Sequence, residues 1–72
     1  ARANPCARLA AQHGLTDRER QTLELLALGE TVAAIARALD VSENTVKTYA
    51  KRVYKKLDVH SKQDIIDLCR EG

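Results

Sequence analysis

The strongest pattern of apolar and polar positions in this chain lies between Ser42 and Leu57. Apolar residues recur there at steps of three and four positions, as in a helix with one buried side: Val46, Ala50, Val53, Tyr54 and Leu57. At about 100° per residue, the opposite side is polar and basic, with Lys47 at its edge: Asn44, Thr48, Lys51 and Lys55. From Thr45 to Leu57 there are five basic residues and no acidic one. A helix anchored in this way and cationic outside suits the major groove of DNA, although a solvated surface helix has the same pattern.

The sequence before this helix carries the end signals of three shorter helices. Asn4 is followed by a proline, which suits a first helical position, and Gly14 can close the same helix. Thr16 and Glu19 form a capping box, in which each side chain satisfies the backbone N–H group of the other residue. Thr31 is placed to cap a third helix. The predicted helices cover about residues 5–13, 17–28 and 32–39.

A last helix is predicted after the turn at residues 58 and 59. Ser61 and Asp64 repeat the capping-box pattern and open a helix over about residues 62–69. Leu25 and Leu28 widen the apolar side of the second helix, so at least one of them is expected at the surface or at a contact. The helical spacing predicts a set of core residues with Leu9 as the main anchor of the first helix: Leu9, Leu23, Leu26, Ala27, Ile35, Ala36, Leu39, Val41, Ile65, Leu68 and Cys69.

The composition is that of one small globular domain. The 72 residues are 44% hydrophobic and 31% charged, and Phe, Trp and Met are absent. The core must therefore be built from Leu, Ile, Val, Ala and two Tyr, which favours closely packed small helices. The net charge is only +2, so affinity for nucleic acid has to come from where the charge is concentrated. No apolar run approaches the roughly 18 residues of a membrane span, and a cytoplasmic location is expected.

Catalytic and metal-binding chemistry is not indicated by the sequence. His13 and His60 are isolated, and the Ser and Thr residues have explanations as helix caps. Cys6 and Cys69 form no CxxC motif or Cys/His cluster. They are expected as one core residue and one surface residue rather than as a metal site or a disulfide. We therefore expect a protein that is not an enzyme and that binds no metal or cofactor.

The third and fourth predicted helices are joined by the short turn from Leu39 to Ser42. Two short helices joined in this way, with the second basic on its outside, form a helix-turn-helix. Packing of Ile35 and Leu39 across the long helix would hold that helix at a fixed angle. Helical adaptors contain similar corners, so a protein-interaction module resembling sigma-factor region four is the alternative. It would use the exposed apolar surfaces at Leu25, Leu28 or Ile66.

Several short motifs keep a fixed relative spacing over about 50 residues: Leu15-Thr16 with Arg18-Glu19, Ala27-x-Gly29, Ile35-Ala36-x-x-Leu39, Val41-Ser42-x-x-Thr45-Val46-Lys47 and Lys56-Leu57-x-Val59. With these motifs, the stretch Leu15–Ile66 resembles the LuxR/GerE-type DNA-binding domain of bacterial transcription regulators. The resemblance implies an all-α, four-helix helix-turn-helix domain over residues 15–72. Its third helix, about residues 43–57, would read double-stranded DNA, and its fourth would pair two subunits on a palindromic site.

The segment before this domain, residues 1–14, is expected to form a short extra N-terminal helix, with a linker remnant as the alternative. Members of the family usually carry a sensor or receiver domain upstream of the module. The resemblance therefore implies that such a domain is missing from this fragment. It also makes RNA polymerase a further candidate partner.

The resemblance implies roles for individual residues as well. The base-reading positions of the family fall on Lys47, Thr48 and Lys51. Its phosphate contacts fall on Thr31 and Thr45, for which an N-cap and a plain surface residue are the alternatives. Lys55 is a third phosphate candidate by its place on the outward side, and Asn44 and Tyr49 are further residues of the DNA face. The pairing helix supplies the expected dimer interface, which consists of Asp64, Ile66, Asp67 and Arg70.

The chain departs from the family pattern at six positions, none of which removes the basic face: Val32, Ala34, Asp40, Tyr49, Asp58 and Lys62. Asp40 and Asp58 stand where glycine is common at the two turns, at some cost in stability. Tyr49 is expected as a partly buried ring whose hydroxyl group reaches the DNA backbone. Arg52 and Lys56 lie toward the flank of the long helix and are expected to be solvated.

Overall fold

The computed structural model describes residues 5–71. In this range helices are the only regular secondary structure, and no strand is present. It forms five helices: α1 (Pro5–His13), α2 (Asp17–Ala27), α3 (Val32–Leu39), α4 (Glu43–Leu57) and α5 (Lys62–Glu71). The predicted all-α class is therefore confirmed. The sequence-based helix boundaries agree to within two residues at every described end. The predicted cap at Asn4 lies outside the described residues.

Side-chain caps fix where three of these helices begin. The Thr16 hydroxyl accepts from the Glu19 N–H group at 3.2 Å, and Glu19 Oε1 accepts from the Thr16 N–H group at 2.9 Å, which is the predicted capping box. Thr31 and Ser42 each accept from the N–H group three residues on, at 3.1 Å. These bonds satisfy N–H groups that have no partner within the helix itself.

The predicted second capping box forms only in part. Ser61 accepts from the Asp64 N–H group at 3.1 Å, as expected. The Asp64 carboxylate, however, accepts from the N–H group of His60 at 3.1 Å, one residue before the predicted partner. Asp64 therefore holds the incoming chain at the start of α5.

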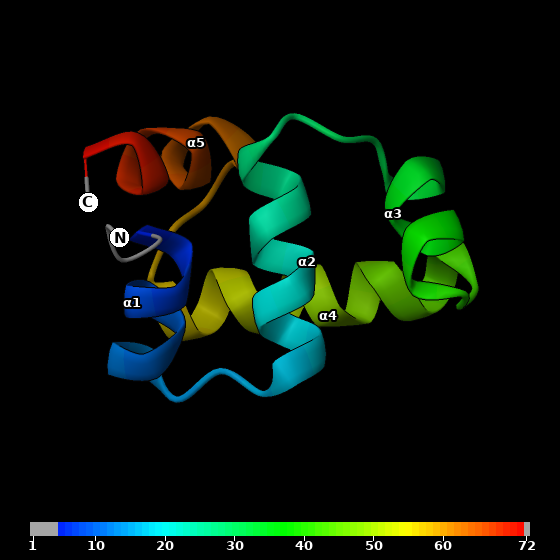
Figure 1. Cartoon of the computed structure of the whole chain (residues 1–72), viewed down its shortest axis with the longest axis horizontal. Coiled ribbons are helices and arrows are strands. Elements are labelled where there is room, and N and C mark those ends of the chain that lie inside the picture. The colour runs from blue at the N-terminus through cyan, green and yellow to red at the C-terminus, as the bar shows by residue number, and fades with distance from the viewer. Residues whose placement is uncertain (1–4, 72) are drawn as a thin grey trace.

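The core lies where α2 crosses α4 and where α3 packs on the N-terminal half of α4 (Figure 1). α1 packs on α2, α4 and α5, and α5 packs on α1 and α2, so the first and last helices lie on the same side of the domain. The fully buried apolar side chains come from α2, α3, α4 and α5: Leu23, Ile35, Val46, Val53 and Ile65. Burial of aliphatic side chains of this size stabilises the fold by about 1.5–3 kcal/mol each. The predicted stripes of α2, α3 and α4 are thus the ones that form the core.

The first and last helices differ from expectation in their packing. Leu9 is only half-buried, whereas Cys6 and Ala10 are the buried residues of α1, at 6% and 4% exposure. The prediction that Leu9 is the main anchor was wrong, because α1 turns the side with its smaller residues inward. On α5, Ile65 is fully buried, while Leu68 and Cys69 are half-buried. Small side chains here let α1 lie close to α2 and α5.

Two turns carry aspartate in the left-handed backbone region. Asp40 ends α3 with φ 57° and Asp58 ends α4 with φ 56°. Their N–H groups donate to helix carbonyl groups of Arg37 and Lys55, both at 3.3 Å. This backbone conformation is unfavourable for residues with a Cβ atom, although less so for aspartate than for most. Asp40 and Asp58, which stand where glycine is common in the family, therefore give two helix ends with a strained backbone.

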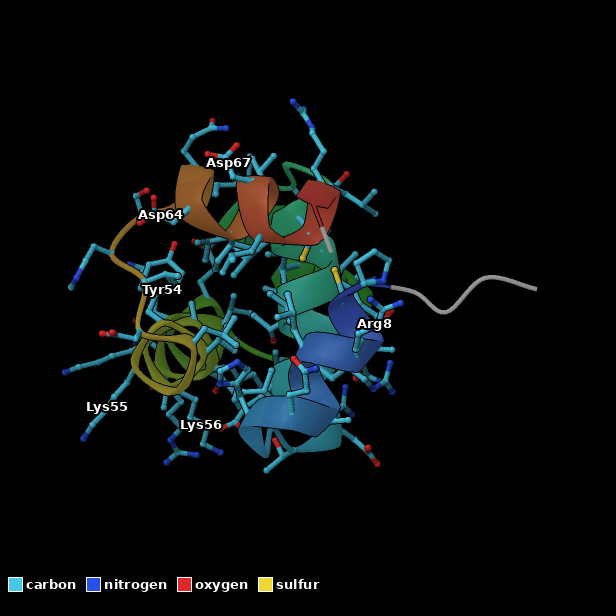
Figure 2. All side chains as sticks on the ribbon, turned by 90° about the vertical axis from the view of Figure 1, so that its left-hand side faces the viewer. Arg8, Tyr54, Lys55, Lys56, Asp64 and Asp67 are labelled. Carbon is cyan, nitrogen blue, oxygen red and sulfur yellow. The ribbon has the colours of Figure 1, made fainter. Side chains whose placement is uncertain are left out.

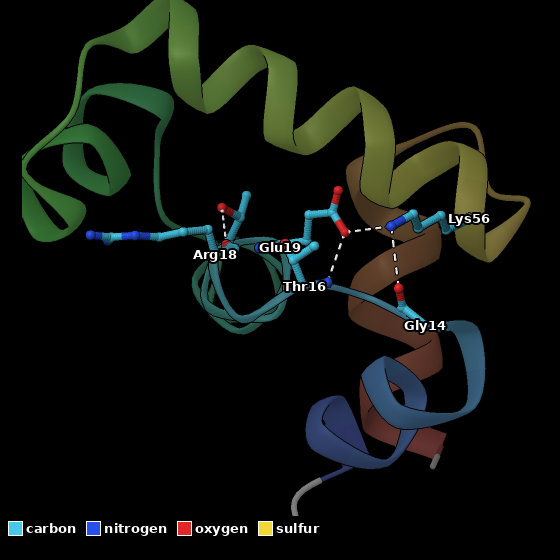
Figure 3. A network of polar contacts seen from close by, with 6 residues as sticks. Gly14, Thr16, Arg18, Glu19 and Lys56 are labelled. Carbon is cyan, nitrogen blue, oxygen red and sulfur yellow. Dashed lines mark hydrogen bonds and ion pairs between the residues drawn. The ribbon is translucent and has the colours of Figure 1, made fainter.

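A buried ion pair joins α2 to α4 near the C-terminal end of α4. Glu19 is 2% exposed, and its Oε1 atom lies 2.7 Å from Lys56 Nζ. Lys56 Nζ also donates to the carbonyl group of Gly14 at 3.2 Å. Figure 2 shows Lys56 and its neighbour Lys55 diverging from α4, and Figure 3 shows the ion pair from close by. The expectation that Lys56 is simply solvated was wrong, because the flank of α4 faces the start of α2.

The charge on Glu19 is kept by its partners. Burial alone raises the pKa of the Glu19 carboxyl group, because it penalises the charged form. Hydrogen bonds from Lys56 and from the Thr16 N–H group, together with the lysine charge, outweigh burial and lower that pKa below its ordinary value. The carboxylate therefore remains ionised inside the fold at neutral pH.

Candidate nucleic-acid interface

The α3–α4 corner is held rigidly from inside. The turn between the two helices is closed by a hydrogen bond from the Val41 N–H group to the carbonyl group of Ala36 at 3.0 Å. From α2, Arg18 Nη1 donates to the carbonyl group of Leu39 at 3.2 Å. Val46, in the first turns of α4, is fully buried. These contacts fix the direction in which α4 leaves the corner, as a helix-turn-helix requires.

The outer side of α4 carries the predicted DNA-face side chains. Asn44, Lys47, Thr48, Lys51 and Lys55 are all exposed. Lys47 and Lys51 are four positions apart, and Thr48 lies three positions before Lys51, so the three side chains are neighbours on the helix surface. Among the residues that the structure describes, no carboxylate pairs with these lysines. Their charges therefore face solvent and are available to an anionic ligand.

The hydroxyl groups near this side already make local hydrogen bonds. Thr48 Oγ1 donates to the carbonyl group of Asn44 at 3.1 Å, so its proton is already used in a bond within α4. Thr45 Oγ1 and Ser42 Oγ lie 2.9 Å apart. Thr31 caps α3, so its structural role is established by the fold. A phosphate contact of Thr31 or Thr45 stays a prediction.

Tyr49 is half-buried and packs against the core cluster, as the sequence predicted for its ring. Tyr54 is also half-buried and lies between α4 and α5, near Asp64 (Figure 2). Burial and the nearby Asp64 charge raise the pKa of the Tyr54 hydroxyl group, so that group is neutral at pH 7.

The four residues predicted for a dimer interface fall into two groups on α5. Asp64 and Asp67 line a shallow hollow beside the end of α4, and Asp67 Oδ1 accepts from Gln63 Nε2 at 3.0 Å. Ile66 and Arg70 line a different hollow, together with Leu28 of α2. Leu28 is 76% exposed, which agrees with the expectation for this part of α2. The structure therefore places the predicted interface residues on two sides of α5.

Sequence reasoning missed three side chains that position this surface, because each bond joins residues far apart in the chain. They are Arg18, whose guanidinium group holds the end of α3, Lys56, which pairs with Glu19, and Lys62. Lys62 Nζ donates to the carbonyl group of Glu30 at 2.7 Å and ties α5 to the loop before α3. The only sequence signal for these contacts was that Arg18 and Lys56 lie within the family motifs.

Two further classes of site are not supported by the described part of the chain. Residues 5–71 contain no helix that is both long and apolar enough to cross a lipid bilayer. No group of three or more His, Cys, Asp or Glu side chains among the described residues is arranged to hold a metal ion.

The model of the family described as "Bacterial regulatory proteins, luxR family" matches residues 13–69 of the chain. The chain belongs to this luxR family. The match covers α2 to α4 completely and reaches the last turn of α5, so it includes the whole helix-turn-helix. The luxR-family domain is a DNA-binding module of transcription regulators and not an enzyme.

Curated relatives with similar sequences also carry the names of regulatory proteins. A putative transcriptional regulator of Pseudomonas aeruginosa is 48% identical over 56 residues, covering 78% of this chain and 27% of that protein. The uncharacterized response regulatory protein YgeK of Escherichia coli is 42% identical over 59 residues, 82% of this chain and 40% of that protein. The transcriptional regulatory protein DesR of Bacillus subtilis is 37% identical over 57 residues, 79% of this chain and 29% of that protein.

The luxR-family chain described here spans well under half of the length of these relatives, between 27% and 40%. The comparison therefore concerns the DNA-binding module and not the whole regulators. No solved structure gave a significant match.

Proposed function

We propose that this luxR-family domain binds double-stranded DNA sequence-specifically by inserting the outer side of α4 into a major groove. The observation that carries the proposal is the exposed set Lys47, Thr48 and Lys51, whose two lysines pair with no carboxylate of the described residues, on a helix whose inner stripe is buried. Lysine ammonium groups donate to guanine O6 and N7, and a threonine methyl group packs on a thymine methyl group. Asn44 and Tyr49 border this set and complete the DNA face.

Phosphate contacts would fix the register of α4 in the groove. Thr31 caps the start of α3 and Thr45 lies in the first turn of α4, so the two hydroxyl groups lie at the N-terminal ends of the two helices. Lys55 extends away from the body of the domain, toward where a phosphate backbone would pass (Figure 2). Such contacts provide much of the affinity but no direct sequence information.

We further propose that two copies pair through α5 on a palindromic site, with half-sites about one helical turn apart. The predicted residues are Asp64, Ile66, Asp67 and Arg70. Pairing on the side of Ile66 and Arg70 is favoured, since that side also carries the exposed Leu28. In the full regulator, an upstream sensor or receiver domain, a cytoplasmic location and contact with RNA polymerase complete the proposal.

The test is fluorescence anisotropy of the chain with a pool of random duplexes at two salt concentrations, compared with Lys47→Ala and Lys51→Ala. Each substitution is expected to remove about 1–3 kcal/mol of discrimination if the lysine contacts a base edge. Arg52→Ala is the matched control, because Arg52 is an exposed basic residue on the flank of the same helix. Equal losses on specific and random DNA would reduce the two lysines to phosphate contacts.

Binding that is indifferent to both lysines would contradict the DNA-reading proposal. The alternative is a protein-interaction module, and the exposed Leu28 is the observation that favours it. An adaptor of that kind would keep its partner in the Lys47→Ala/Lys51→Ala double variant and lose it in Leu28→Ser. The pairing proposal has its own test, since Ile66→Asp should weaken binding to a full palindrome but not to a half-site.

A further inference from the structure

Two cysteines that are 63 residues apart in the chain meet between α1 and α5. The Sγ atoms of Cys6 and Cys69 lie 2.7 Å apart, with the Cys6 thiol as the donor. Cys6 is in the first turn of α1 and is 6% exposed, and Cys69 is in the last turns of α5 and is half-buried. The two yellow sulfur atoms in Figure 2 lie between these helices. The sequence-based expectation of a surface position for one of the two was therefore wrong.

The distance between the two sulfur atoms is only slightly longer than a disulfide bond. A disulfide has an S–S length of about 2.05 Å, so the sulfur atoms need to approach by only about 0.7 Å. Helices α1 and α5 are already in contact, and the side chains already point at each other. A metal ion does not explain the pair, because no third ligand of the described residues joins it.

We propose that Cys6 and Cys69 are an oxidative modification site, at which a small disulfide such as glutathione disulfide drives formation of a reversible disulfide that ties α1 to α5. The Cys6 side of this bond lies before residue 13, where the match to the luxR family begins. The bond would thus fasten the segment that enters the domain to its last helix. The proposal does not depend on DNA binding.

The surroundings of the two thiols indicate which of them reacts first. Both cysteines line an open hollow, which Glu24 and Arg70 border and through which a small reagent can reach Cys69. Burial, followed by the hydrogen bond with Cys69, raises the pKa of the Cys6 thiol to about 12. Cys6 therefore stays protonated at neutral pH, and the more exposed Cys69 is the first nucleophile.

The exchange proceeds in two steps. The Cys69 thiolate attacks one sulfur atom of the small disulfide, whose S–S bond breaks, and one small thiolate leaves with a proton from solvent. Cys6 then gives up its proton and attacks Cys69 Sγ, and the second small thiolate leaves. Two protein thiols are oxidised, and one small disulfide is reduced to two thiols.

The experiment compares the purified chain after incubation with glutathione disulfide or with dithiothreitol. We expect the thiol titre to fall from two to none, with an intact mass lower by two hydrogen atoms and no covalent dimer. Because the bond closes a long loop, the melting temperature followed by circular dichroism should rise by about 10 °C or more. Dithiothreitol should reverse each of these changes.

Single substitutions provide matched controls. In Cys6→Ala the remaining Cys69 should carry one stable glutathione adduct, and the melting temperature should not rise. In Cys69→Ala the buried Cys6 should react slowly or not at all. Two glutathione adducts on the unsubstituted chain, covalent dimers, or an internal disulfide without a gain in melting temperature would each overturn the proposal. The oxidised and reduced forms of the unsubstituted chain give this answer even if a variant does not fold.

Discussion

Replacing Lys56 by methionine should destabilise the domain more than the same replacement of any other lysine of α4. The substitution keeps the length of the side chain but leaves the Glu19 carboxylate buried without its partner. Breaking a buried ion pair costs about 3–5 kcal/mol. Lys56 is 36% exposed, so water screens part of the interaction, and we expect about 2–3 kcal/mol. Domains of this size have total stabilities of about 4–11 kcal/mol, so the loss is a large fraction.

The assay is urea unfolding at pH 7, followed by circular dichroism, because the chain has no tryptophan. Lys55→Met is the matched control, since Lys55 is the adjacent lysine and is exposed without a pairing carboxylate among the described residues. A loss of about 2–3 kcal/mol corresponds to a melting temperature lower by roughly 10–20 °C. If both variants unfold at the same urea concentration, the ion pair contributes no net stability and the reasoning is refuted.

Three further changes test the local structure. The lowered pKa of the Glu19 carboxyl group means that the unfolded state takes up this proton at a higher pH than the folded state does. The free energy of unfolding should therefore fall as the pH drops below about 4.3, the ordinary pKa of a glutamate. In melting curves taken there, the difference in melting temperature between the unsubstituted chain and Lys56→Met should narrow. Asp58→Gly should stabilise by about 0.5–1 kcal/mol in urea titrations, since it relieves the left-handed backbone and removes a carboxylate from a helix C-terminus; Asp58→Asn should recover only the charge part. Ser42→Ala should cost about 1 kcal/mol and Ser42→Gly only a few tenths, and equal losses would show that the cap bond is not the cause.

The helix ends were predictable because their signals are local. Thr16, Thr31 and Ser42 each bond a backbone group within three residues, so the residue type and its spacing contain the whole interaction. The buried stripe of α4 was predictable for a similar reason, since a helix of this period can shield only one side. The same periodicity predicted the exposure of Lys47 and Lys51. Their roles on DNA rest on the family resemblance and stay predictions.

Interactions between distant segments were not predictable in this way. Helical periodicity places Lys56 on the flank of α4, and a flank residue is solvated or paired according to what packs beside it. Here the start of α2 lies beside it, with Glu19 37 positions away in the chain. The meeting of the two cysteines was missed for the same reason, since only the approach of α1 brings Cys6 to Cys69. The predicted dimer residues were grouped by sequence range, whereas the packing of α5 separates them into two sides.

The first turn of α2 holds the helix-turn-helix at two places, the turn between its helices and the C-terminal end of α4. Arg18 donates to the last carbonyl group of α3, and its neighbour Glu19 holds Lys56 near the end of α4 (Figure 3). The two contacts come from successive residues of one helix, so any shift of α2 moves both α3 and the reading helix. In the proposed binding mode, the angle at which α4 meets DNA therefore depends on residues outside the predicted DNA face. Because base contacts need correct placement as well as the correct side chain, the proposed DNA binding would depend on Arg18 and Glu19 through orientation and on Lys47 and Lys51 through contact.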